Sequence, residues 1–168
     1  MTFDIDAFKA DMPADVLAIL DSADAPYSRP EAAEPALQAA VQKAPDNLAL
    51  RIASYAFYFY ANRLHEAMPH AEACLAIAAR ALGVAEDWRL VDRSSADFSD
   101  PARPQRVYLK SLFALGFCRA RLGDVETALP ILHKVASLDA KDELGSKTLI
   151  GFLQRGGASA ESDGDDED

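Results

Sequence analysis

The sequence predicts an all-α protein, and three observations lead to this prediction. The chain has 168 residues, of which 50% are apolar, enough for one domain with a buried core. Alanine, the strongest helix former, is abundant, whereas valine, isoleucine and threonine are sparse outside short clusters. Apolar residues recur every three or four positions, as they do on the buried face of a helix.

Capping and turn residues predict where the helices begin and end. A short helix is expected after Pro13, and residues 24–27 should break it. Ser28 and Glu31 match a capping box, with a proline between them in the first turn. The short helix after Pro13 carries an apolar face made of Val16, Leu17 and Leu20. The helix that follows the capping box carries another, made of Leu37, Ala40, Val41 and Ala44. Asn62, Gly83 and Gly123 favour tight helix ends and turns, which gives helices over residues 48–61, 64–82, 105–122, 125–138 and 141–154.

The domain organisation follows from where this periodicity is lost. Residues 1–27 form an N-terminal helical segment, and residues 28–155 form a helical domain. Residues 83–104 are rich in Ser, Asp and Pro and are expected to be an insert loop. Residues 156–168 open with two glycines and become strongly acidic, so a disordered tail is expected.

The charge of the chain argues against two classes of partner. The net charge is −10, and six of the acidic residues lie in residues 161–168, which leaves about −4 on the remainder. An acidic body repels phosphate backbones and anionic lipids, so neither nucleic acid nor a membrane is an expected partner. The N-terminus lacks a basic and then apolar signal, and no apolar run is long enough to span a bilayer, so a cytoplasmic location is expected.

Residues suited to catalysis or metal binding are few. Glu66, His70 and Cys74 share one helix face at four-residue spacing, but a free cysteine there is more typical of a small packed residue. Cys118, the second cysteine, is expected in the core as well. The sequence contains no phosphate-binding glycine loop, nucleophile elbow or Cys-x-x-Cys pair. We therefore expect no catalytic residues, no metal and no cofactor.

Residues 112–139, LFALGFCRARLGDVETALPILHKVASLD, contain an internal pattern of small and apolar positions. Gly116 would let two helices approach closely, Gly123 would make the sharp turn, and Ala128 is small where the helices cross. Residues 48–81 follow the same pattern with Tyr58, Asn62 and Ala67, although Arg51 and Tyr55 depart from it. Both segments resemble units of the tetratricopeptide repeat (TPR) family. The resemblance implies a short right-handed TPR-like superhelix of antiparallel helix pairs.

A second resemblance covers more of the chain. The block RIASYAFYFYANRLHEAMPHAEACLAIAARALG, followed by DWR and ADFS, is similar to short bacterial TPR proteins, some of them encoded near nitrogen-fixation genes. A TPR superhelix binds partners on a concave face lined by the first helix of each pair. That register predicts a partner-binding groove made of Ile52, Phe59, Tyr60, Arg63, Lys110, Phe113, Phe117 and Arg121. The Lys and Asn positions of the two-carboxylate clamp found in chaperone-binding TPR proteins hold apolar residues here.

The insert provides a second candidate site. Trp88 is the only tryptophan, Arg89 follows it directly, and Phe98 lies nearby. An exposed tryptophan would anchor a partner, whereas a buried one would cap the helical core.

These observations favour a protein–protein interaction module, an adaptor or assembly chaperone that binds a peptide or helix in an apolar and aromatic groove. The alternative is a structural protein that self-associates as a homo-oligomer, through a last helix carrying Leu149, Ile150 and Leu153. A metal-binding protein or an enzyme that uses His70 and Cys74 is the remaining alternative.

Overall fold

The computed structural model describes residues 6–21 and 30–156, and within these ranges it contains only helices and the loops that join them. Seven α-helices and two short 3₁₀ helices are present in this part of the chain. Their bounds are η1 Asp6–Asp11, α1 Ala14–Asp21, α3 Pro30–Lys43, α4 Leu48–Tyr60, α5 Leu64–Leu82, η2 Trp88–Leu90, α6 Arg103–Arg121, α7 Val125–Leu138 and α8 Ser146–Gln154. The prediction of an all-α fold is confirmed. The predicted break at 24–27, the cap at Ser28 and the acidic tail lie outside the described residues.

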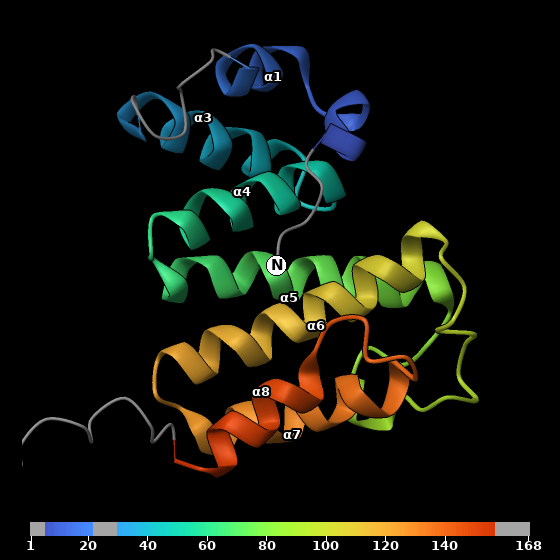
Figure 1. The fold of residues 1–168 in the computed structure, drawn as a ribbon. Coiled ribbons are helices and arrows are strands. Elements are labelled where there is room, and N and C mark those ends of the chain that lie inside the picture. Colours follow the sequence, from blue (N-terminus) through green and yellow to red (C-terminus); the bar gives the residue numbers. More distant parts are fainter. Residues whose placement is uncertain (1–5, 22–29, 157–168) are drawn as a thin grey trace, which may run out of the picture.

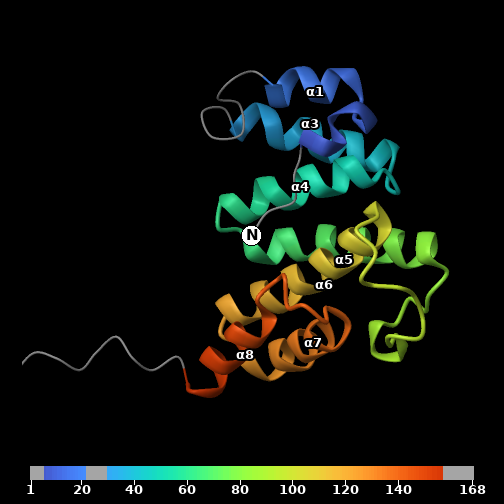
Figure 2. The same ribbon diagram turned by 45° about the vertical axis from the view of Figure 1, so that its right-hand side comes forward.

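The α-helices are stacked in chain order, each packed against the next (Figures 1 and 2). Packing is most extensive in the middle of the stack, where α5 lies between α4 and α6, and α6 between α5 and α7. One continuous hydrophobic core runs through these layers. The insert therefore separates α5 from α6 in sequence without separating them in space.

The hairpin of α4 and α5 ends where its capping residues predict. The side chain of Asn47 accepts a hydrogen bond from the backbone N–H of Leu50 at 3.0 Å, which caps the start of α4. Asn62 has φ = 58°, the left-handed conformation expected at the turn. Gly83, with φ = 67°, ends α5 in the same way. The predicted bounds of α5 are confirmed.

The hairpin of α6 and α7 depends on one close approach. A Cβ atom built on Gly116 would lie 2.8 Å from Cδ2 of Leu132, so a larger residue at this crossing would force the Leu132 side chain to shift. Gly123 makes the turn with φ = 81°, and Asp124 caps α7 by accepting from the N–H of Thr127 at 3.2 Å. Ala128 is fully buried. The roles predicted for these small residues are confirmed.

The last helix begins at Ser146 and not at residue 141 as predicted. The carboxylate of Asp139 accepts from the backbone N–H of Leu144 at 2.9 Å and holds the preceding segment in a turn. Asp142 and Gly145 both have positive φ, 53° and 72°, which a helix cannot accommodate. These side-chain caps compete successfully with helix propensity.

The N-terminal segment contributes to the same core. The sequence did not predict η1, whose Phe8 is buried together with Met12 and with Val16 of α1. The guanidinium of Arg103, at the start of α6, lies 4.7 Å from the Phe8 ring centre and bonds the carboxylate of Asp11 at 2.9 Å. None of the helices in the described ranges has the length and apolar character needed to traverse a lipid bilayer.

Candidate functional site

The predicted groove corresponds to a row of aromatic rings along α4 and α6, here called the aromatic strip (Phe59, Tyr60, Phe113 and Phe117). The Phe59 and Phe117 ring centres lie 6.0 Å apart and join the two helices. Phe113 continues the row along α6 at 6.1 Å from Phe117, and Tyr60 extends it along α4 at 5.7 Å from Phe59. These are ordinary distances for interacting aromatic pairs. The predicted register therefore brings residues from both hairpins together.

The residues predicted to line the groove differ in how much of each side chain is exposed to solvent. Tyr60 is 48% exposed, and Phe59 and Phe117 are half-buried. Phe113 is only 5% exposed and Ile52 is fully buried. Ile52 thus belongs to the core below the strip, and Phe113 is the buried end of the strip that supports the ring of Phe117.

Two of the three predicted cations lie beside the strip. Lys110 and Arg121 share the face of α6 that carries Phe113 and Phe117, because their spacing follows the helical repeat. Lys110 is half-buried and has no ion-pair partner within the described ranges, whereas Arg121 donates to the side-chain oxygen of Asn62 at 2.9 Å.

Arg63 is directed elsewhere. Its guanidinium bonds Glu34 of α3 at 2.8 Å and Glu66 of α5 at 2.9 Å, and it lies 4.8 Å from the Tyr58 ring centre. These bonds lower the pKa of both carboxyl groups. This network ties Arg63 to α3 and α5, and its place at the rim of the groove stays a prediction.

The insert is anchored to α7 by contacts that the sequence did not suggest. The ammonium group of Lys134 donates to the carbonyl oxygens of Val91 at 2.7 Å and Arg89 at 3.1 Å. Val91 is fully buried, and the buried Phe98 packs on Tyr108 of α6 with ring centres 5.4 Å apart. Phe98 is therefore a core residue. No local pattern indicates the Lys134 contacts, since they join residues more than forty positions apart in sequence.

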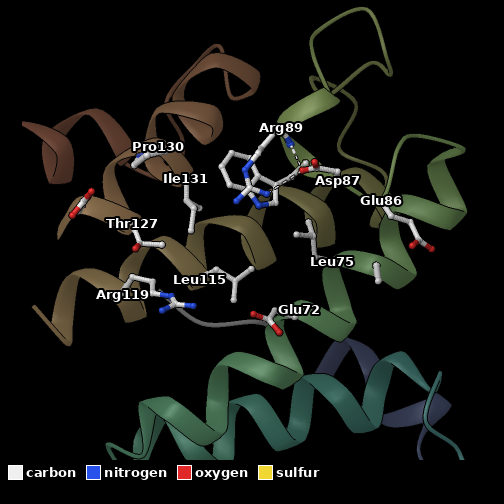
Figure 3. Close-up of a pocket in the computed structure, with 13 residues that line it drawn as sticks. Glu72, Leu75, Glu86, Asp87, Arg89, Leu115, Arg119, Thr127, Pro130 and Ile131 are labelled. Carbon is white, nitrogen blue, oxygen red and sulfur yellow. Dashed lines mark hydrogen bonds and ion pairs between the residues drawn. The ribbon is translucent and has the colours of Figure 1, made fainter. Parts of the chain in front are cut away.

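A surface cavity of about 790 Å³ lies between α5, α6, α7 and the insert (Figure 3). Its apolar floor is made by Leu75, Leu115 and Ile131, whose side chains point into the hollow in Figure 3. Trp88 lines it from the insert and is half-buried. The guanidinium of Arg89 covers the Trp88 ring at 4.6 Å from its centre. The cavity therefore combines an apolar floor with an aromatic wall.

The rim of this cavity is acidic. It carries four carboxylates, those of Glu72, Glu86, Asp87 and Glu126, against two guanidinium groups. One of these cations, Arg89, is paired with Asp87 at 3.2 Å. Asp87 also accepts from the backbone N–H of Arg89, and this bond keeps the pKa of its carboxyl below the usual value. The second cation is engaged outside the rim, so the mouth of the cavity is net negative.

The cavity and the aromatic strip occupy opposite sides of α6. Leu115 and Arg119 line the cavity, and Phe113 and Phe117 lie in the strip. Residues two positions apart on an α-helix differ by about 200° in direction. The sequence assigned the strip but not the cavity, because the cavity requires residues from four separate segments.

The residues considered for catalysis are buried or engaged in packing. His70 stacks on Tyr58 with ring centres 5.5 Å apart, and its Nδ1 lies 3.4 Å from the guanidinium of Arg51. Burial, aided by this cation, lowers the pKa of His70 to about 4. Burial raises the pKa of the Cys74 thiol to about 12 and that of Cys118 to about 11. Across residues 6–21 and 30–156, no group of three or more His, Cys, Asp or Glu side chains is arranged to hold a metal ion.

Comparison with known proteins identifies a distant relative. The chain is 29% identical over 129 residues to an uncharacterized 19.8 kDa protein in the nifW 5′ region of Azotobacter chroococcum mcd 1. The match covers 76% of this chain and 72% of that protein. No family model matches the sequence, and no solved structure matches the fold. The chain is therefore a distant homologue of that Azotobacter protein.

Proposed function

We propose that this chain is a protein-interaction module, an adaptor or assembly chaperone that holds a peptide or helix of another protein on the aromatic strip. One observation carries the proposal: exposed Tyr60 is continuous with the half-buried rings of Phe59 and Phe117. Aromatic side chains that are partly exposed and fixed by neighbouring rings are typical anchors of protein interfaces.

The proposal includes a TPR-type arrangement of the two central hairpins. In each hairpin a left-handed turn residue, Asn62 or Gly123, precedes a fully buried alanine, Ala67 or Ala128, by the same number of residues. This matched spacing supports an equivalence between the hairpins α4–α5 and α6–α7. In a right-handed TPR superhelix the first helices of both pairs would line one concave face, and α4 and α6 carry the aromatic strip.

The neighbouring cations define the chemistry of the partner. Lys110 and Arg121 lie on the same face of α6 as the strip, one turn before Phe113 and one turn after Phe117. A partner segment with an apolar or aromatic anchor and a flanking carboxylate would complement this surface in shape and charge. The first partners to test are proteins encoded beside this gene, because the Azotobacter relative is described by its position in the nifW 5′ region.

The proposal is tested by affinity capture from the native lysate with the wild-type chain and with Tyr60→Glu and Phe117→Glu. Phe152→Glu is the matched control, since Phe152 is an exposed aromatic residue, 51% exposed, on α8 and outside the strip. We expect proteins captured by the wild type and by the control to be lost with both strip variants. Circular dichroism confirms that each variant is folded. Identical sets of captured proteins for all four chains would refute a binding role for the strip.

Self-association is the second candidate function, and the exposure of Phe152 favours it. Leu149 and Leu153 of the same helix are half-buried, whereas Ile150 is buried in the core. An exposed phenylalanine beside partly covered leucines is a suitable surface for a second copy. Light scattering over a wide concentration range tests this function, and a monomer at every concentration would exclude it.

A further inference from the structure

The cavity between α5, α6, α7 and the insert has the composition of a binding site for a cationic amphipathic segment. Its volume, about 790 Å³, lies within the range of pockets that enclose a few side chains or a small ligand. Leu75, Leu115 and Ile131 are at most 6% exposed, so the floor is a fixed apolar surface (Figure 3). A floor of this kind accepts an apolar side chain and gains free energy from its burial.

The rim determines the charge of the occupant. Glu72 on α5 and Glu126 on α7 are exposed and have no hydrogen-bond or ion-pair partner in the described part of the chain. Arg119 of α6 also lines the cavity, but its ion pair is with Asp124, at 3.1 Å, and not with either of these carboxylates. Two unneutralised carboxylates beside an apolar floor attract a cation and repel anions such as nucleic acid or lipid headgroups.

The cavity already holds one guanidinium group in the manner expected of a ligand. Arg89 lies over the ring of Trp88 at 4.6 Å and forms an ion pair with Asp87. This arrangement of an aromatic face and a carboxylate is a common mode of cation recognition. Arginine and lysine side chains are therefore compatible with this environment.

We propose that this cavity binds a segment of another protein that places a lysine or arginine side chain at the acidic rim, to which Glu72 and Glu126 belong, and an apolar side chain on the floor. This surface is distinct from the aromatic strip, which lies on the opposite side of α6 and favours an acidic partner. The chain would then hold two partner segments of opposite charge, one on each side of α6.

Trp88 provides the measurement, because it is the only tryptophan in the chain and lines the cavity. The probe is a tryptophan-free helical peptide of about fifteen residues with lysine and leucine on one face. We expect a saturable change in Trp88 fluorescence emission with this peptide. We expect no change with a peptide in which glutamate replaces lysine, or with one in which serine replaces leucine.

The variant Glu72→Gln/Glu126→Gln tests whether the rim recognises the charge. Both side chains are exposed and unpaired, so the fold should be unaffected, and the peptide should bind about fivefold more weakly. The matched control is Glu161→Gln/Asp163→Asn in the acidic tail, which removes the same charge elsewhere and should bind the peptide as the wild type does.

Three results would overturn the proposal. Absence of a saturable change with the lysine–leucine peptide would show that the cavity does not bind it. Equal weakening by the rim variant and the tail variant would show that only net charge matters. A change in Trp88 emission with protein concentration alone would assign the cavity to a second copy of the chain. Phe117→Glu should leave the titration unchanged, which separates this test from that of the aromatic strip.

Discussion

Gly116→Ala should destabilise the protein, although alanine is the better helix former. The added Cβ atom would lie 2.8 Å from Cδ2 and 2.9 Å from Cγ of Leu132, and 3.3 Å from Cγ2 of Ile131. Leu132 is fully buried and cannot move into solvent to make room. Overpacking of this kind costs about 1–3 kcal/mol, whereas the gain in helix propensity is about 1 kcal/mol. We therefore expect a net loss of up to about 2 kcal/mol in the free energy of unfolding.

Urea denaturation followed by circular dichroism measures this loss. Gly151→Ala in α8 is the matched control, because its Cβ would meet only the terminal guanidinium nitrogen of Arg155, at 3.4 Å. That side chain can move, so we expect this variant to be unchanged or stabilised by up to about 1 kcal/mol.

A double variant tests the assigned cause of the effect. A Leu132→Ala background removes the two shortest contacts and leaves only Cγ2 of Ile131 at 3.3 Å, so Gly116→Ala should destabilise the protein much less there. If Gly116→Ala alone stabilises the protein by the full gain in helix propensity, about 1 kcal/mol, the close approach of α6 and α7 is not a constraint and the argument fails. The same conclusion follows if the loss persists undiminished without the leucine.

Three further predictions concern pH, the insert and the thiols. As the pH falls from about 6.5 to about 4, the free energy of unfolding of the wild type should decrease by about 2 kcal/mol more than that of His70→Phe, because His70 stays neutral in the folded state and is protonated in the unfolded state. Equal decreases for the two proteins in urea denaturation would contradict this. Lys134→Met should leave two carbonyl oxygens of the insert without their hydrogen-bond donor, and so increase proteolysis of the insert and shift the Trp88 emission to the red. Unchanged cleavage would show that Lys134 does not anchor the insert. Cys74 and Cys118 should react slowly with a thiol reagent in the native protein and rapidly in denaturant, and fast native labelling would contradict their burial.

Helices whose ends depend on neighbouring residues could be predicted from the sequence. α5 and α7 have the predicted bounds, because Gly83 and Asp124 act within one turn of the helix that each ends or caps. The start of α8 was predicted too early, because the caps formed by Asp139 and Asp142 compete with a helical pattern that is locally acceptable. Asp6–Asp11 was missed because Phe8 is ordered by packing on other helices and not by its own sequence.

At the candidate sites, burial and ion pairing could not be predicted from residues close in sequence. Helical spacing alone placed Phe113 and Phe117 on one face of α6, but only the tertiary packing buried Phe113 and left Phe117 half-buried. The ion pair of Arg63 with Glu34 could not be predicted, because Glu34 lies on another helix almost thirty residues earlier.

By itself, the sequence determined the helical class, most helix ends and the face on which each apolar row lies, since these depend on interactions within a few residues. The tertiary structure alone decided which of those rows remain accessible and created the acid-rimmed cavity, in which Glu72, Trp88, Leu115 and Glu126 meet. The physical reason is that exposure and charge pairing depend on contacts between distant segments. No pattern along a single helix reports such contacts.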